Sequence, residues 1–89
     1  MKGYSLIHAR PGTSGSVLLA MEKLKRTTPT IKSADYVYGT FDVVVVIEAE
    51  TEEEFVRALS AIGTVDNVTA TNTLVVATRD LAVKYALSS

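Results

Sequence analysis

The sequence predicts an α+β fold whose elements follow the order β-α-β-β-α-β. Two stretches repeat apolar residues at the spacing of amphipathic helices, and four have the composition of strands. One of these strands, Val43 to Ile47, is apolar at every position rather than at every second one. Because successive side chains of a strand point to opposite sides of the sheet, this strand must be buried on both faces.

A turn separates the first strand from the first helix. Tyr4 to Ala9 forms the strand, and Arg10-Pro11-Gly12 ends it, because proline fixes φ and glycine accepts positive φ. A hydroxyl between positions 13 and 16 can cap the helix that follows. The apolar stripe of this helix consists of Val17, Met21 and Leu24. A proline at position 29 ends it.

The second and third strands are predicted to form a hairpin. Ile31 to Tyr38 is the second strand, and its Lys32 and Asp35 suit an edge strand that must resist open-ended pairing. Gly39-Thr40 is a tight link to the third strand, which begins at Phe41 or Asp42 and continues through Ala49.

The second helix and the fourth strand complete the domain. Thr51 to Glu54 has the form of a capping box, and the apolar residues Phe55, Leu59 and Ile62 recur behind it until Gly63 ends the helix. Val68 to Ala77 is the fourth strand. We expect the domain to span residues 1–78 and residues 79–89 to form a C-terminal tail. Possible packing residues of the tail are Leu81, Tyr85 and Leu87.

This order is that of the split ferredoxin-like fold. Right-handed crossovers place the first and third strands in the centre of a four-stranded antiparallel sheet, with both helices on one face. Val44 and Val46 then point to the face that two helices leave uncovered. We expect a second copy to pack sheet to sheet there, as in a dimeric α+β barrel. The expected interface residues are Val44, Val46 and Tyr36.

Composition excludes several classes of function. The 89 residues make one domain, and a net charge of −1 with a pI near 5.7 gives no attraction to nucleic-acid backbones. The absence of cysteine excludes disulfides, thiolate metal sites and cysteine nucleophiles. No apolar run is long enough to span a bilayer, so a cytoplasmic protein is expected. We expect no cofactor and no metal site.

Two short motifs resemble the regulatory domain of the Lrp/AsnC family, often called RAM. They are a glycine, any residue, aromatic, aspartate pattern, Gly39-Thr40-Phe41-Asp42, and a threonine, any residue, threonine entry to the last strand, Thr71-Asn72-Thr73. The resemblance covers Gly3 to Ala77. Full-length members carry an N-terminal helix-turn-helix domain, so the chain is similar to a stand-alone form that does not bind DNA itself.

The resemblance implies an amino-acid effector, bound where dimers meet in a ring, often of four dimers. Backbone N–H groups of the glycine turn can reach the effector's carboxylate, and Asp42 can pair with its ammonium. The full set of implied ligand-binding residues is Tyr38, Gly39, Thr40, Phe41, Asp42, Thr71, Thr73 and Leu74. Such a ring would sequester or co-assemble with full-length Lrp/AsnC regulators.

Each of these residues also has a simpler explanation. Gly39 suits any hairpin turn, Asp42 can hydrogen-bond the turn backbone, and Thr71 and Thr73 are ordinary strand residues. A rival interpretation is a small cofactor-independent enzyme that uses His8, the single histidine, as acid or base. A purely structural assembly domain is a third. No second catalytic group is evident, so we expect a non-enzyme.

Overall fold

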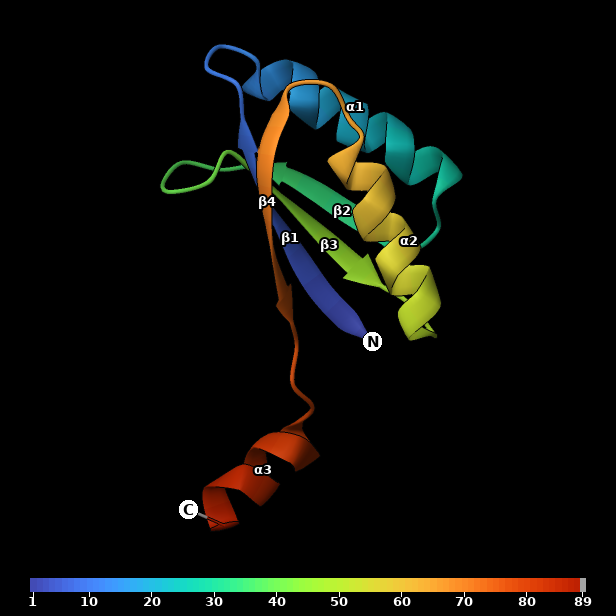
Figure 1. The fold of residues 1–89 in the computed structure, drawn as a ribbon, viewed down its shortest axis with the longest axis vertical. Helices are drawn as coiled ribbons and strands as arrows, with labels where there is room; N and C mark the ends of the chain where they lie inside the picture. Colours follow the sequence, from blue (N-terminus) through green and yellow to red (C-terminus); the bar gives the residue numbers. More distant parts are fainter. Residues whose placement is uncertain (89) are drawn as a thin grey trace.

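The computed structural model describes residues 1–88, apart from the side chains of Leu81 and Ser88, so the packing predicted for Leu81 lies outside the description. The described residues follow the predicted order, with one further helix at the C-terminal end (Figure 1). The elements are β1 (Lys2–Ala9), α1 (Ser14–Thr27), β2 (Ile31–Tyr36), β3 (Val43–Glu48), α2 (Glu52–Gly63), β4 (Val68–Val75) and α3 (Arg79–Ser88).

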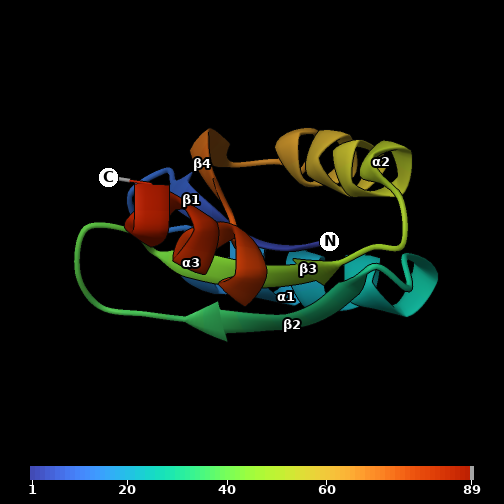
Figure 2. The same ribbon diagram turned by 90° about the horizontal axis from the view of Figure 1, so that it is seen from below.

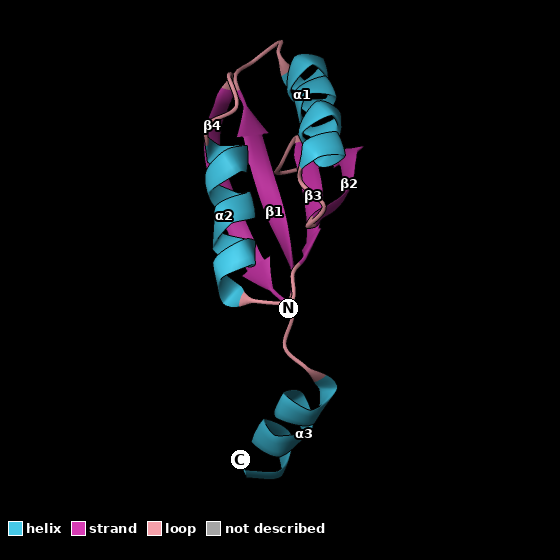
Figure 3. Ribbon diagram, turned by 90° about the vertical axis from the view of Figure 1, so that its right-hand side faces the viewer, coloured by secondary structure: helices cyan, strands magenta, loops and turns pink. Residues whose placement is uncertain are grey.

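The described strands form an antiparallel sheet in the order β2-β3-β1-β4. The two central strands are therefore β1 and β3, as the crossover rule predicts. Both α1 and α2 lie on one face of this sheet (Figure 3). The ferredoxin-like α+β fold is confirmed.

The core lies between the sheet and these two helices. Val43, Val45 and Ile47 of β3 are fully buried in it, as is Ile7 of β1. The helices contribute mainly Val17, Met21, Phe55, Ala58 and Ile62. Val44 and Val46 alternate with the buried residues of β3 and are only half-buried. The alternation predicted for β3 is confirmed.

The face of the sheet opposite α1 and α2 is called the open face below. Its residues on β1 and β3 are Lys2, Tyr4, Leu6, His8, Val44, Val46 and Glu48, and the register between β1 and β4 adds Leu74, which lies opposite Tyr4. No helix of residues 1–88 packs on this face (Figure 3). The apolar side chains of one chain therefore remain partly in water there.

Tyr36 does not join this face in a single chain. A bulge in β2 between Ile31 and Ser33 shifts the register by one residue, so that Tyr36 pairs with the core residue Val43. A shift of one residue moves every later side chain to the other face of a sheet. Tyr36 therefore lies on the helix face of the sheet rather than beside Val44 and Val46, and its expected place in an interface stays a prediction.

The link between β2 and β3 is a loop of residues 37–42 rather than the predicted tight turn, and it projects from the sheet (Figure 2). Its two ends are joined by the N–H of Val37, which donates to the carbonyl of Asp42 at 3.0 Å. Gly39 has φ of 133°, a conformation that favours glycine. This conformation agrees with the turn expected at Gly39.

Other boundaries differ slightly from the predicted ones. Thr51 caps α2 as predicted, since its hydroxyl accepts from the N–H of Glu54 at 3.2 Å. At α1 the hydroxyl of Thr13 instead donates to the carbonyl of Arg10 at 2.7 Å. β4 ends at Val75, two residues early, and the tail forms α3 with Tyr85 and Leu87 exposed.

Two small residues of β1 decide how closely the layers pack. A Cβ on Gly3 would lie 2.5 Å from Cζ of Phe55 and 2.6 Å from the carbonyl oxygen of Leu74, so only glycine fits there. Ser5 is fully buried, and its Oγ has no hydrogen-bond partner among the described residues.

Candidate functional site

The candidate site begins at the 37–42 loop. The N–H groups of Tyr38, Gly39, Thr40 and Phe41 have no hydrogen-bond partner among the described residues. The side chains of Tyr38 and Thr40 are exposed, and that of Phe41 is half-buried. The loop therefore has four successive backbone donors that are available to an acceptor.

Asp42 fastens this loop to the end of β1. Its carboxylate oxygen Oδ2 accepts the N–H of Ala9 at 2.8 Å, and its own N–H donates to the carbonyl of Ile7 at 2.9 Å. The bond to Ala9 falls where the pairing of β1 with β4 shifts between His8 and Ala9. Because the strand pairing is irregular here, the N–H of Ala9 would otherwise be hydrogen-bonded to water. Asp42 supplies the acceptor for it instead.

The sequence reasoning foresaw a backbone hydrogen bond for Asp42, but to the turn rather than to β1. A bulge at His8 carries no signature in the sequence, and the partner of Asp42 depends on it. The second oxygen of the carboxylate, Oδ1, has no partner among residues 1–88.

His8 lies against the loop through an aromatic contact. The rings of His8 and Phe41 have centroids 4.5 Å apart and an interplanar angle of 37°. Both side chains are half-buried. His8, the candidate acid or base of an enzyme, therefore lies next to the 37–42 loop, the candidate effector site. Their separation in the sequence did not indicate this.

Tyr36 and Tyr38 form a second aromatic pair at the other end of the loop. Their rings meet edge to face with centroids 5.9 Å apart. The side chain of Tyr38 is 96% exposed and that of Tyr36 is 49% exposed. Exposed aromatic side chains of this kind are common at protein interfaces.

The β4 residues of the predicted site lie at different distances from the loop. Thr71 pairs with Ile7, whose carbonyl accepts the N–H of Asp42, so Thr71 lies one strand away from the end of the loop. Thr73 pairs with Ser5, and both threonines share the helix face of the sheet, whereas Leu74 lies on the open face. Leu74 lies opposite Tyr4, while Asp42 binds Ala9, a separation of roughly 17 Å along β1 at the rise of a strand. One chain therefore does not bring Leu74 or Thr73 to the 37–42 loop.

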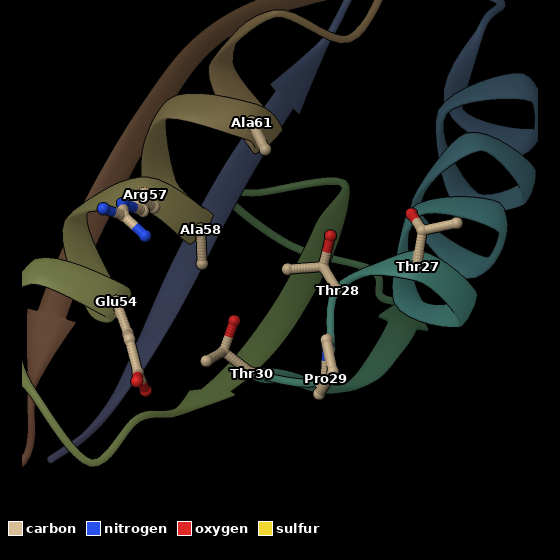
Figure 4. A pocket seen from close by; sticks show the side chains of 8 residues that line it. All are labelled: Thr27, Thr28, Pro29, Thr30, Glu54, Arg57, Ala58 and Ala61. Atoms are coloured by element: carbon tan, nitrogen blue, oxygen red, sulfur yellow. The ribbon is translucent and has the colours of Figure 1, made fainter.

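A groove lies on the helix face of the molecule (Figure 4). It has a volume of about 500 Å³ and lies between α2 and the segment 27–30 at the end of α1, where Ala58 and Ala61 leave space. Several of its polar groups are already engaged: Lys32 donates to the carbonyl of Pro29 at 2.7 Å, and Arg57 pairs with Glu53. The groove contains none of the predicted site residues.

Residues 1–88 contain no cluster of three or more side chains suited to a metal ion. They also contain no helix that is long and apolar enough to cross a membrane.

No protein-family model matches the chain, and no curated protein sequence matches it. Several solved structures have a similar fold. AsnC of E. coli superposes with a TM-score of 0.75 at 20% identity, over 88% of this chain and 51% of AsnC. The chain has the fold of an Lrp/AsnC regulatory domain. It spans about half the length of AsnC.

Two smaller proteins share this regulatory-domain fold over nearly their whole length. TTHA0845 from Thermus thermophilus has a TM-score of 0.75 at 22% identity, over 86% of this chain and 92% of that protein. FFRP-DM1 has a TM-score of 0.70 at 25% identity, over 85% of this chain and 97% of that protein. About one seventh of this chain lies outside the match with FFRP-DM1.

An enzyme shares the fold more distantly. The 5-chloro-2-hydroxyhydroquinone dehydrochlorinase of Burkholderia phenoliruptrix AC1100 has a TM-score of 0.51 at 15% identity. The fold alone therefore does not separate a regulator from an enzyme, and the choice between them depends on the site.

Proposed function

We propose that this chain is a non-enzymatic regulatory domain of the Lrp/AsnC type, which associates with itself and binds a free amino acid at the 37–42 loop. The observation that supports the proposal is the hydrogen bond between Asp42 and Ala9. It fixes the loop, with its unpaired backbone N–H groups, at the end of the uncovered open face.

The loop offers both charges of an amino acid a partner. The N–H groups of Gly39, Thr40 and Phe41 suit a carboxylate, because glycine lets the backbone approach a ligand closely. The free Oδ1 of Asp42 suits an ammonium, because Oδ2 already accepts Ala9. A carboxylate with one fixed oxygen is a preorganised partner, which lowers the entropy cost of binding.

The remaining site residues would come from another copy. Thr73 and Leu74 lie too far from the loop of their own chain, so they complete the site only where a second loop approaches β4. The exposed ring of Tyr38 and the half-buried ring of Phe41 are the proposed wall for the effector's side chain. An effector placed between copies favours the assembled state through its differential affinity.

Self-association is proposed to begin at the open face. Burying Val44 and Val46 would each contribute about 1.5–3 kcal/mol. The resulting dimers would form a ring, such as an octamer, which binds full-length Lrp/AsnC regulators in the cytoplasm.

A thermal-shift screen against the common amino acids, with light scattering on every hit, tests the proposal. We expect at least one amino acid to raise the melting temperature and change the scattering mass. If no amino acid does either, effector binding is wrong and a structural assembly domain is the better description.

The contact between His8 and Phe41 supports one alternative function, that of a cofactor-independent enzyme. That function requires turnover that His8→Ala abolishes. Our proposal expects His8→Ala to bind the effector reversibly and any added amino acid to be recovered unchanged by mass spectrometry. Turnover lost in His8→Ala would overturn the regulatory interpretation.

A further inference from the structure

α3 stands apart from the rest of the described chain (Figures 1 and 3). It does not pack on the sheet, on α1 or on α2, and residues 76–78 connect it to β4. Two apolar residues on one side of this helix are uncovered: Val83 is 40% exposed and Leu87 is 83% exposed. They are four positions apart, so they form a stripe along one face of the helix.

A helix of this length needs a surface to pack on. α3 has 10 residues, and isolated helices shorter than about 12–15 residues are marginal in water. Its first turn is closed by the N–H of Ala82, which donates to the carbonyl of Thr78 at 3.0 Å. Its own sheet and helices do not supply the packing that would stabilise the turns that follow.

Uncovered apolar side chains of the open face continue to the end of β4. Leu74 lies on the open face and is 50% exposed, and Val76, two residues later, is 44% exposed. The N–H of Val76 donates to the carbonyl of Lys2 at 2.8 Å, so β4 keeps its course along β1 to this point. An interface on the open face would therefore extend to the segment that precedes α3.

The structure directs α3 away from its own sheet (Figures 1 and 3). Val76 is bound to Lys2, the first residue of β1, so β4 has reached the end of the sheet there and α3 continues beyond it. In this conformation only another molecule can cover the apolar side of α3.

We propose that α3 is an exchanged arm, which packs through Val83 and Leu87 on the second copy that covers the open face. In a two-fold dimer each copy then gives its arm to the other, so two arms close one interface. This inference rests on the self-association proposed above.

The absence of cysteine allows a direct test. A nitroxide is attached to Lys84→Cys, an exposed position next to Val83, in unlabelled protein, which is mixed with ¹⁵N-labelled protein of the natural sequence. We expect the nitroxide to broaden amide signals of the labelled partner. The matched control carries the nitroxide on Leu19→Cys, which is 67% exposed on α1 and is expected to broaden signals of its own chain alone.

The reverse arrangement distinguishes exchange from folding back. The nitroxide and ¹⁵N are placed on the same chain, which is diluted with excess unlabelled natural protein. Broadening of the sheet signals in this sample, with none in the mixed sample, would show that α3 packs on its own chain and would overturn the proposal.

Sedimentation supplies a second measurement. Ending the chain at Thr78, or replacing both Val83 and Leu87 by glutamate, is expected to weaken dimerisation about tenfold or more and to leave the amide spectrum of residues 1–75 folded. Unchanged dimerisation of both variants would overturn the arm. If Val44→Glu abolishes dimerisation while both arm variants leave it unchanged, the open-face interface stands and the arm alone is wrong. A natural protein that stays monomeric would overturn both.

Discussion

The carboxylate of Asp42 accepts the backbone N–H of Ala9 at 2.8 Å, across two segments that are 33 positions apart in the sequence. This bond fixes the end of the 37–42 loop against β1 at the point where the pairing of β1 and β4 becomes irregular. It also orients the second carboxylate oxygen, which is proposed to bind the ammonium of an effector. Asp42 would therefore have a structural and a binding role, and substitutions can separate the two.

Asp42→Asn tests the charge without removing the acceptor. The amide oxygen of asparagine can still accept the N–H of Ala9, so we expect the free energy of unfolding to stay within about 0.5 kcal/mol of the natural value. The neutral side chain no longer attracts an ammonium, so amino-acid affinity should fall about tenfold or more in calorimetry. Asp42→Ala is the comparison and should lose affinity and also about 1 kcal/mol of stability. Natural affinity in Asp42→Asn would contradict the proposed role.

Gly3 should not tolerate even one methyl group. Its Cβ would overlap Cζ of Phe55 and the carbonyl oxygen of Leu74, and the latter is backbone that moves only with β4. We expect Gly3→Ala to lower the free energy of unfolding by about 2 kcal/mol or more in urea titrations.

Gly15→Ala is the matched control for Gly3→Ala. No atom lies within 4 Å of a Cβ at Gly15, and alanine is the better helix former, so we expect a gain of about 0.5 kcal/mol in α1. Equal effects of the two substitutions would show that space at Gly3 does not limit the packing.

Ser5→Ala is expected to stabilise the protein. The Oγ of Ser5 leaves water on folding and gains no partner among the described residues, which costs free energy that an alanine would not incur. We expect the free energy of unfolding to rise by about 1 kcal/mol. Ser33→Ala, at a half-buried position of β2, should change it by less than about 0.5 kcal/mol. A loss of stability in Ser5→Ala would reveal a hydrogen bond at Oγ.

The sequence predicted the sheet better than the site, and particular residues show why. The alternation of Val43 to Ile47 depends on the period of a strand alone, so the buried and open faces of β3 followed directly. The sequence did not indicate that Tyr36 lies on the other face from Val44, because the bulge near Lys32 reverses the later alternation of β2 and nothing in the local sequence marks that bulge. The length of the 37–42 loop was underestimated for a related reason, since it depends on Asp42 binding the distant residue Ala9.

The candidate site was predicted from motifs, which indicate residue types rather than their distances. The segment from Gly39 to Asp42 does lie together, because its residues are adjacent in the chain. Thr73 and Leu74 were grouped with it by resemblance, yet one chain holds them near the other end of β1. A site shared between two copies would bring the threonine motif of β4 close to the 37–42 loop despite their separation in one chain. A single sequence contains no direct signal that a site is shared in this way.

Val44→Glu tests whether the open face is an interface. Val44 is half-buried beside Leu6 in the single chain, so a glutamate there can still reach water in a monomer, but not beneath a second sheet. We expect the dissociation constant of the dimer to rise about 100-fold or more in sedimentation, because a two-fold interface would bury two such carboxylates. Val56→Glu is the control, since Val56 is 51% exposed on α2 and lies on the opposite side of the molecule. It should leave the dissociation constant within about threefold of the natural value. A Val44→Glu protein that remains folded and dimerises as tightly as the control would place the interface on another surface.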